Sequence, residues 1–512
     1  MTILPLLAMF HLPKSRGSRL VVMAISLLSL SSSRGASTTS ERKQPLPYQT
    51  LHYNNTIDHL APFHPQKKKT SFAHRYLLND DFFGTHPQLS NTCPGPIFLY
   101  AGNEAAVTGF WNGNGFMHYL AETYGGLLIF PEERYYGTSW PTEKCCTYLT
   151  TQQVLEDYVE LLGHVKRSYN AESCPTIVFG GSYGGTLAAY LRYAYPHAVQ
   201  GALAASSELG YYDLAGWDER NITEFTFAEV VATQYAKYDG CLEAISNASD
   251  AIDATDNQTL LDAFNFCDDS SLHPQKSSIF TYALEGLPQS NYPYPIGHLP
   301  AWPVAHVCDI MVQDSLPLLG RAAKVTAIIM GYDLDSDSGC LPTPEEGPGN
   351  IPGDGPGKGS WGYQSCTETL HLFSSSRRNG HGIRSFDFEA NLHKFLQLCI
   401  DLYDVVPEWN VLAERYGGFD IAKMTTNTIF SSGKLDPWGG AAILERDGGH
   451  DAARRGVYFF SMENGAHHLD LKGWHKEAPA DVTATRKKEE EIIMGWVNDW
   501  ASGSRTQTVE ES

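Results

Sequence analysis

An apolar, β-branched run at residues 176–179 leads directly into the GGSYGG of residues 180–185 and then into a helical pattern that Pro196 ends. A strand, a sharp turn with serine and a helix in this order are typical of a nucleophile elbow, which exposes the serine hydroxyl at the carboxyl edge of a sheet. Gly180 and Gly184, two residues to either side of Ser182, let the flanking backbones approach closely. The sequence therefore predicts Ser182 as a catalytic nucleophile, although the motif alone also fits a glycine-rich turn without chemistry.

An oxyanion hole is expected beside this serine. The helix that follows would direct its amino terminus and the backbone amide of Tyr183 at a developing negative charge. A second donor is expected from the loop after the apolar strand at residues 96–100, which reads Gly102-Asn103-Glu104. The backbone amide of Asn103 or a neighbour is the candidate, and a plain turn is the alternative.

The acid and the histidine of a triad follow two later strand candidates in the order Ser, Asp, His. The run at residues 427–430 leads to Asp436, and the run at residues 456–462 leads to His467. In this arrangement His467 takes the proton from Ser182 and later gives it to the leaving group, while Asp436 orients the imidazole.

Two other interpretations of these polar residues remain open. Asp436 stands before a proline and fits a simple turn. His467, His468 and Asp470 resemble a metal cluster, but adjacent histidines on a strand point in opposite directions and fit one ion poorly. We therefore predict no metal and no cofactor.

The placement of the apolar runs predicts an α/β-hydrolase fold with a large, mainly helical inserted cap domain. Runs at residues 96–100, 126–130 and 201–205 are continuously apolar, as in parallel strands that are buried on both faces. About 220 residues with helix-like patterns then precede the strand that leads to Asp436. The expected division is a hydrolase domain at 45–207 and 416–502, a cap at 208–415, and a flexible tail at 503–512.

The combination of motifs resembles the family of serine exopeptidases that includes lysosomal Pro-X carboxypeptidase and dipeptidyl peptidase II. The resemblance implies Ser182 as nucleophile, Asp436 as triad acid and His467 as base, with proline-containing peptides as substrates and a possible homodimer. Departures from the family pattern are Glu133 before RYYG, Ala105 after GNE, and Ser432. The motifs that carry the resemblance are GGSYGG at 180–185, LDPW at 435–438, GAHHLDL at 465–471, LYAGNE at 99–104, ERYYGTSWP at 133–141 and GYQSCTE at 362–368.

The ten cysteines are expected to form disulfides, because the chain carries the marks of a secreted protein. Counting does not assign the pairs. The family resemblance implies Cys241 with Cys308, Cys267 with Cys340, and Cys366 with Cys399. The state of the other four, Cys93, Cys145, Cys146 and Cys174, stays open.

Residues 1–35 read as a signal peptide, with basic residues before an apolar run from Leu20 to Leu30 that is too short to span a bilayer. The formal net charge of −21 argues against nucleic acid or an anionic membrane as a partner. No later stretch reaches the length of a membrane span, so the mature protein is expected to be soluble. The signal peptide and the family resemblance together imply a lysosomal, vacuolar or secreted protein. Glycosylation sequons stand at Asn54, Asn221, Asn247 and Asn257.

Which end of a peptide is trimmed depends on the charge that anchors it. Glu104 and Glu133 are candidate partners for a substrate ammonium, whereas Arg134 and His468 are candidate partners for a substrate carboxylate. Each also fits a structural ion pair. Trp438 is a candidate wall of an apolar pocket for a proline ring.

We favour Pro-X carboxypeptidase action, because Gly362 gives the start of the GYQSCTE segment no carboxylate. A dipeptidyl aminopeptidase that releases X-Pro or X-Ala is the alternative. A secreted esterase or lipase is a more remote alternative, because these enzymes use the same fold and the same catalytic triad.

Overall fold

The computed structural model describes residues 45–61, 70–86, 89–90, 92–143, 145–266, 276–313, 315–331, 334 and 360–503. The expected signal peptide, the tail after residue 503, and Cys267 and Cys340 lie outside this part of the chain.

An eight-stranded sheet forms the centre of the molecule, with strand order β1-β2-β4-β3-β5-β6-β9-β10. β1 and β2 pair antiparallel, β2 is antiparallel to β4, and all remaining neighbours are parallel. The strands are β1 (Gln49–Thr56), β2 (Ser71–Asn79), β3 (Ile97–Tyr100), β4 (Leu127–Pro131), β5 (Thr176–Gly181), β6 (Gly201–Ala205), β9 (Thr428–Gly433) and β10 (Val457–Met462).

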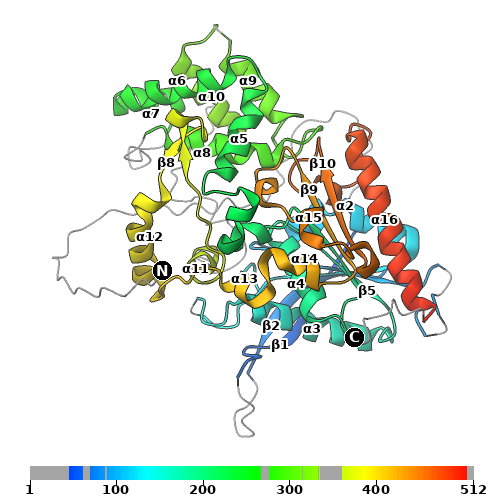
Figure 1. Cartoon of the computed structure of the whole chain (residues 1–512). Helices are drawn as coiled ribbons and strands as arrows, with labels where there is room; N and C mark the ends of the chain where they lie inside the picture. Colours follow the sequence, from blue (N-terminus) through cyan, green and yellow to red (C-terminus); the bar gives the residue numbers. More distant parts are fainter. Residues whose placement is uncertain are drawn as a thin grey trace.

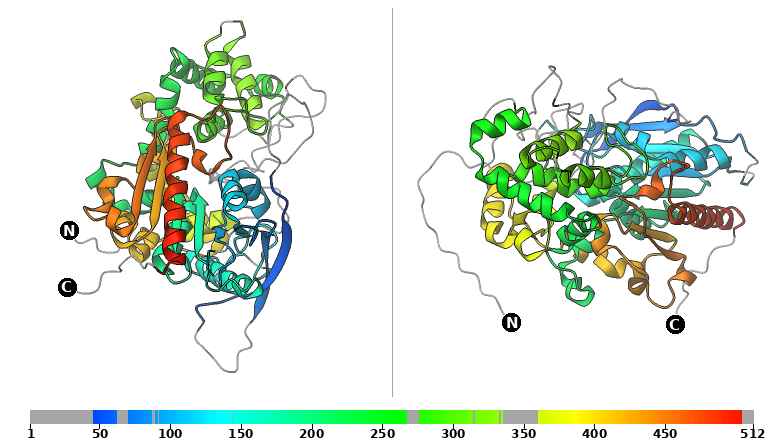
Figure 2. Two further views of the ribbon diagram at one scale, coloured as in Figure 1. Left: turned by 90° about the vertical axis from the view of Figure 1, so that its right-hand side faces the viewer. Right: turned by 90° about the horizontal axis from the view of Figure 1, so that it is seen from above.

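Helices cover both faces of this sheet, and alternate residues of each strand point to opposite layers. In β5, Ile177 and Phe179 pack into one core with α1, α2 and α16, whereas Val178 packs into the other with α3 and α4. These helices are α1 (Val107–Gly113), α2 (Gly115–Tyr124), α3 (Thr151–Ser168), α4 (Tyr183–Ala194) and α16 (Ala480–Ala501). Figure 2 (left) shows α16, in red, running along the strands near the end of the chain. The expected α/β-hydrolase fold is confirmed.

A mainly helical insertion lies between β6 and β9, and Figure 1 shows its green helices α6 to α10 gathered at the top of the view, with α12 at the left. Disulfides join α6 to α9 through Cys241 and Cys308, and α11 to α12 through Cys366 and Cys399. The insertion contains α5 (Thr226–Ala236), α6 (Cys241–Ala254), α7 (Asn257–Phe264), α8 (Ser278–Gly286), η5 (Leu287–Ser290), α9 (Pro303–Met311), α10 (Leu318–Met330), α11 (Ser360–Thr367), α12 (Phe388–Tyr403), α13 (Val411–Tyr416) and α14 (Ile421–Met424).

Two further disulfides lie in the hydrolase part, Cys93 with Cys174 and Cys145 with Cys146. The four sequon asparagines, Asn54, Asn221, Asn247 and Asn257, are all exposed, as attachment of a glycan requires. Across the described ranges, the model contains no helix with the length and apolarity needed to cross a bilayer.

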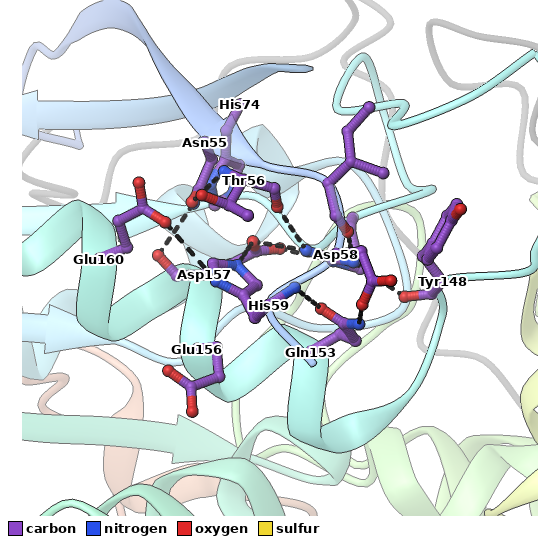
Figure 3. Close-up of polar contacts among 12 residues, drawn as sticks. Asn55, Thr56, Asp58, His59, His74, Tyr148, Gln153, Glu156, Asp157 and Glu160 are labelled. Atoms are coloured by element: carbon purple, nitrogen blue, oxygen red, sulfur yellow. Dashed lines mark hydrogen bonds and ion pairs between the residues drawn. The ribbon is translucent and has the colours of Figure 1, made fainter. Parts of the chain in front are cut away.

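A buried polar network fixes β1 and β2 to α3, with Asp157 at its centre (Figure 3). Asp157 accepts two hydrogen bonds of 2.6 Å from the Arg134 guanidinium and one of 2.8 Å from His59. Burial alone would raise the pKa of Asp157, but the Arg134 charge and hydrogen bonds outweigh it and lower that pKa. Arg134 also donates to the carbonyls of Thr56 and Ile57. It is therefore a structural cation that secures the edge of the sheet.

We expect Arg134→Met to lower the free energy of unfolding by about 3–5 kcal/mol, because it leaves the buried Asp157 carboxylate without its charge partner. Lys488→Met is the matched control, since Lys488 pairs with Glu491 on the surface and should cost at most about 1 kcal/mol. Urea denaturation of the two variants measures the difference. A cost for Arg134→Met similar to that of the control would contradict the structural role.

Candidate active site

The predicted nucleophile lies in the sharp turn between β5 and α4. Ser182 has φ 61° and ψ −132°, a conformation that L-residues rarely adopt and that costs about 1–3 kcal/mol. The glycines around it allow this turn, because a Cβ at Gly180 would overlap the carbonyl of Gly184 and one at Gly184 would overlap the Asn103 side chain. The backbone N–H of Ser182 donates to the Ala205 carbonyl of β6 at 3.0 Å. The turn is thus held by close packing from both sides.

The predicted acid and base meet at the carboxyl ends of β9 and β10. His467 Nδ1 lies 2.8 Å from Asp436 Oδ2, and both side chains are fully buried. The other Asp436 oxygen accepts the backbone N–H of Trp438 at 3.1 Å. Because a carboxylate only accepts, we assign the proton to His467 Nδ1, which leaves Nε2 to act as a base. Among the described residues, Nε2 has no hydrogen-bond partner.

The Ser182 hydroxyl does not point to this base in the structure. Its Oγ donates to Oε1 of Glu208 at 3.0 Å. Glu208 lies in the segment after β6 and is buried, and its backbone N–H donates to Thr186 Oγ1 of α4 at 3.1 Å. A turn of the Ser182 side chain is therefore needed before His467 receives its proton.

The second oxygen of Glu208 is held by two residues of the insertion, one of them in η1 (Leu209–Tyr212). Tyr212 donates its hydroxyl to Oε2, and His371 Nε2 lies 3.3 Å from the same atom. Burial alone would raise the pKa of Glu208, but the contacts with His371, Tyr212 and Ser182 outweigh it and lower that pKa. Sequence analysis missed Glu208, and its position just after a parallel strand was the signal that could have found it.

Two more buried carboxyls lie near the nucleophile, and both are more basic than usual. Burial, reinforced by the charge of Glu208, raises the pKa of Glu104 to about 7. Burial and the charge of Glu104 raise the pKa of Glu133 well above its usual range. Glu133 Oε1 accepts from the Tyr183 hydroxyl at 3.3 Å and from Gln364 at 3.1 Å. The three carboxyls form a chain of like charges that favours protonation of Glu104 and Glu133.

The loop predicted to complete the oxyanion hole is tied to the elbow. Asn103 Nδ2 donates to the Gly181 carbonyl at 2.9 Å, and its Oδ1 accepts from the Tyr100 hydroxyl at 2.6 Å. Tyr183 is the first residue of α4, where a helix has no carbonyl of its own for the backbone N–H. The use of these two backbone amides as oxyanion donors stays a prediction.

Trp438 lies in an aromatic cluster that reaches His467, the predicted base. Its ring centroid is 6.3 Å from that of His467, 5.1 Å from His371 and 5.6 Å from Phe373. Its indole N–H donates to the Gln289 side chain at 3.0 Å. The ring is therefore fixed, and it forms one wall beside the histidine.

The insertion also holds the histidine loop. The carbonyl of Gln289 in η5 accepts the backbone N–H of His467 at 3.1 Å. Tyr292 donates its hydroxyl to the His467 carbonyl at 2.9 Å. The insertion thus positions the predicted base.

Neither predicted carboxylate anchor supplies a cation to the site. Arg134 is engaged by Asp157, and burial lowers the pKa of His468 well below its usual range, which keeps the ring neutral. His468 instead donates its backbone N–H to Ser206 Oγ at 2.8 Å. Within the described part of the chain, no group of three or more His, Cys, Asp or Glu side chains could hold a metal.

The raised pKa of Glu104 makes stability depend on pH. From the ordinary value of 4.5 to about 7, the unfolded chain has lost this proton while the folded chain still holds it. Stability therefore falls as pH rises through this window, by up to about 3 kcal/mol. In Glu104→Gln, the free energy of unfolding should no longer show this contribution to its fall with pH. In Glu477→Gln, where the substituted residue is exposed, the fall should be the same as in the wild type. Urea denaturation between pH 4.5 and 7.5 measures the free energy of unfolding of each variant. An equal fall with pH in the wild type and in Glu104→Gln would refute the raised pKa of Glu104.

Comparison with known proteins agrees with this geometry. The family model described as serine carboxypeptidase S28 matches residues 57–489. The lysosomal Pro-X carboxypeptidase of Homo sapiens is 31% identical over 486 residues, covering 90% of each chain. Prolyl carboxy peptidase like protein 5 of Caenorhabditis elegans is 28% identical over 85% of this chain and 87% of its own, and thymus-specific serine protease of Mus musculus is 25% identical over 86% of each. The chain belongs to the serine carboxypeptidase S28 family and is a serine peptidase.

Proposed function

We propose that this serine exopeptidase removes the C-terminal residue that follows a proline, through an acyl-enzyme on Ser182. The single observation that carries the mechanism is the 2.8 Å contact between His467 Nδ1 and Asp436 Oδ2, and His467 Nε2 has no hydrogen-bond partner in the part of the chain that the structure describes. The proline preference is supported by the Pro-X carboxypeptidase relatives, which are similar over 90% of the chain.

The proposed reaction begins when the Ser182 hydroxyl turns from Glu208 to His467 Nε2. Oγ attacks the scissile carbonyl while its proton passes to Nε2, and Asp436 stabilises the imidazolium. The backbone amides of Tyr183 and Asn103 then stabilise the oxyanion. The proton moves to the leaving amine as the C–N bond breaks. Water, activated by the same histidine, hydrolyses the acyl ester and restores Ser182.

Trp438 supports an apolar surface for a proline ring. It is fixed by its hydrogen bond to Gln289 and packs edge-on against Tyr211 and Phe227. A rigid ring on a fixed aromatic wall loses little conformational entropy on binding. The wall therefore favours proline over a flexible side chain.

A dipeptidyl aminopeptidase is the second candidate, and the carboxyls around Ser182 favour it. Glu104 and Glu208 place acidic groups near the nucleophile, while the predicted cations Arg134 and His468 are engaged or neutral. An ammonium suits these groups better than a substrate carboxylate does. The charge of Glu104 becomes available above pH about 7, so this activity should rise with pH.

We also propose a lysosomal location, in line with the lysosomal relatives. Protonation of Glu104 at acidic pH relieves repulsion within the buried carboxyls, which suits such a compartment. The homodimer stays an expectation from the family resemblance, and light scattering of the mature protein tests it.

Two peptides distinguish the candidate activities. We expect N-blocked Ala-Pro-Phe to release phenylalanine, whereas a free-amine Ala-Pro chromogenic amide should react more slowly at pH 5 to 7. Ser182→Ala should abolish turnover of both. Efficient cleavage of the free-amine substrate alone would overturn the carboxypeptidase assignment and leave the triad assignment standing.

Trp438→Ala should reduce kcat/KM for a proline substrate about 10–100-fold more than for its alanine counterpart, because it removes the aromatic wall. Trp500→Ala is the matched control, since Trp500 is half exposed on α16 and lies outside the site. An unchanged ratio of proline to alanine turnover in Trp438→Ala would remove this residue from the pocket.

A further inference from the structure

We propose that Glu208 is a positioning residue that withholds the Ser182 hydroxyl from His467 in the free enzyme and so lowers the reactivity of the nucleophile. The inference rests on the proposed acyl-enzyme at Ser182 and adds a control of that step. It is independent of the residue that a substrate places beside the serine, because the restraint exists before a substrate binds.

The Ser182 hydroxyl has two acceptors to choose between, and in the structure it uses the carboxylate. Its Oγ donates to Glu208 Oε1 at 3.0 Å, whereas His467 Nε2 has no hydrogen-bond partner among the described residues. The backbone of Ser182 is held by its N–H, which donates to the Ala205 carbonyl, so rotation of the side chain is what moves the hydroxyl. The contact with Glu208 therefore competes with the contact that general-base catalysis needs.

The Glu208 carboxylate is held in place and does not follow the serine towards the histidine. Its backbone N–H donates to Thr186 Oγ1 at 3.1 Å, and Tyr212 donates its hydroxyl to Oε2. His371 Nε2 lies 3.3 Å from the same oxygen. These contacts occupy Oε2 and leave Oε1 to the Ser182 hydroxyl.

The charge of Glu208 makes it a strong acceptor. Burial alone would raise the pKa of this carboxyl, but the contacts with His371, Tyr212 and Ser182 outweigh burial and lower that pKa, so the group is ionised at neutral pH. A hydrogen bond to an ionised acceptor favours the bonded state by about 10- to 100-fold. The Ser182 hydroxyl is therefore on His467 in only a small fraction of the free enzyme.

The contact with Glu208 is lost as acylation proceeds. When Oγ bonds to the attacked carbonyl carbon, its proton goes to His467 and then to the leaving amine, whose bond to that carbon breaks. Oε1 then has no Ser182 donor, and a buried carboxylate oxygen without a partner is costly. An interaction that is present in the ground state and absent from the transition state raises the barrier. Weakening this contact should therefore accelerate acylation, which the loss of a merely structural contact would not do.

The rate at which a small fluorophosphonate labels Ser182 at neutral pH measures this restraint. In that reaction Oγ bonds to phosphorus, fluoride leaves and the serine proton passes to His467. We expect Glu208→Gln, whose neutral amide is a weaker acceptor, to be labelled at least about tenfold faster than the wild type. Glu208→Asp keeps the negative charge but is shorter by one methylene group, which draws the acceptor away from Oγ, so it should also be labelled faster.

Glu229→Gln is the matched control, because Glu229 is a partly exposed carboxylate paired with His381, and its labelling rate should equal that of the wild type. Equal or slower labelling of Glu208→Asp would overturn the proposal. An acceleration confined to Glu208→Gln would also overturn it and assign the effect to the removed charge.

If Glu208→Asp does not fold, a crystal structure of the free wild-type enzyme decides. The Ser182 hydroxyl on Glu208 would support the restraint, and the same hydroxyl on His467 Nε2 would overturn it. Failure of wild-type Ser182 to react with the fluorophosphonate at all would instead contradict the proposed function itself, and this inference with it.

Discussion

The strained turn at Ser182 is the constraint on which the rest of the site depends. A positive φ at a residue other than glycine is held only where the surroundings leave the chain no alternative. Here the Ala205 carbonyl of β6 accepts a hydrogen bond from the Ser182 N–H. The carbonyl of Gly184 packs closely against Gly180, and the Asn103 side chain packs closely against Gly184. The same contacts align α4 and the loop after β3 on the nucleophile. The contacts that hold this strained residue therefore also position the amino terminus of α4 and the loop that is predicted to complete the oxyanion hole.

The inserted helices contribute side chains and hydrogen bonds to the candidate active site. Gln289 binds both the His467 backbone and the Trp438 indole, and Tyr292 holds the His467 carbonyl. Gln364 and His371 from the same insertion reach Glu133 and Glu208. A change in the position of the cap would thus alter the base, the aromatic wall and the buried acids at once. In the proposed mechanism, substrate selection and catalysis therefore depend on the same contacts.

Local patterns predict much of this fold and the order of Ser182, Asp436 and His467 along the chain. The buried strands β3 to β6 read as continuous apolar runs, and the elbow has a motif of its own. β1 and β2 were not predicted, because their buried polar residues, such as Asn55 and His74, find hydrogen-bond partners that are distant in sequence. Glu208 was missed for a similar reason: its partners Ser182 and His371 are distant in sequence. Arg134 was considered as a substrate anchor because its charge can be read from the sequence. Its partner Asp157, which makes it a structural cation, is found only in the structure.

The central claim is that Ser182 is a nucleophile activated by the His467–Asp436 pair. Reaction with a fluorophosphonate, followed by mass spectrometry of the peptide that contains residue 182, measures this directly. The account predicts one phosphonate on Ser182 and labelling slowed by about 10³-fold or more in a folded Asp436→Asn variant, because the imidazole then loses its orienting acceptor. Labelling at another residue, or an unchanged rate in that variant, would contradict it.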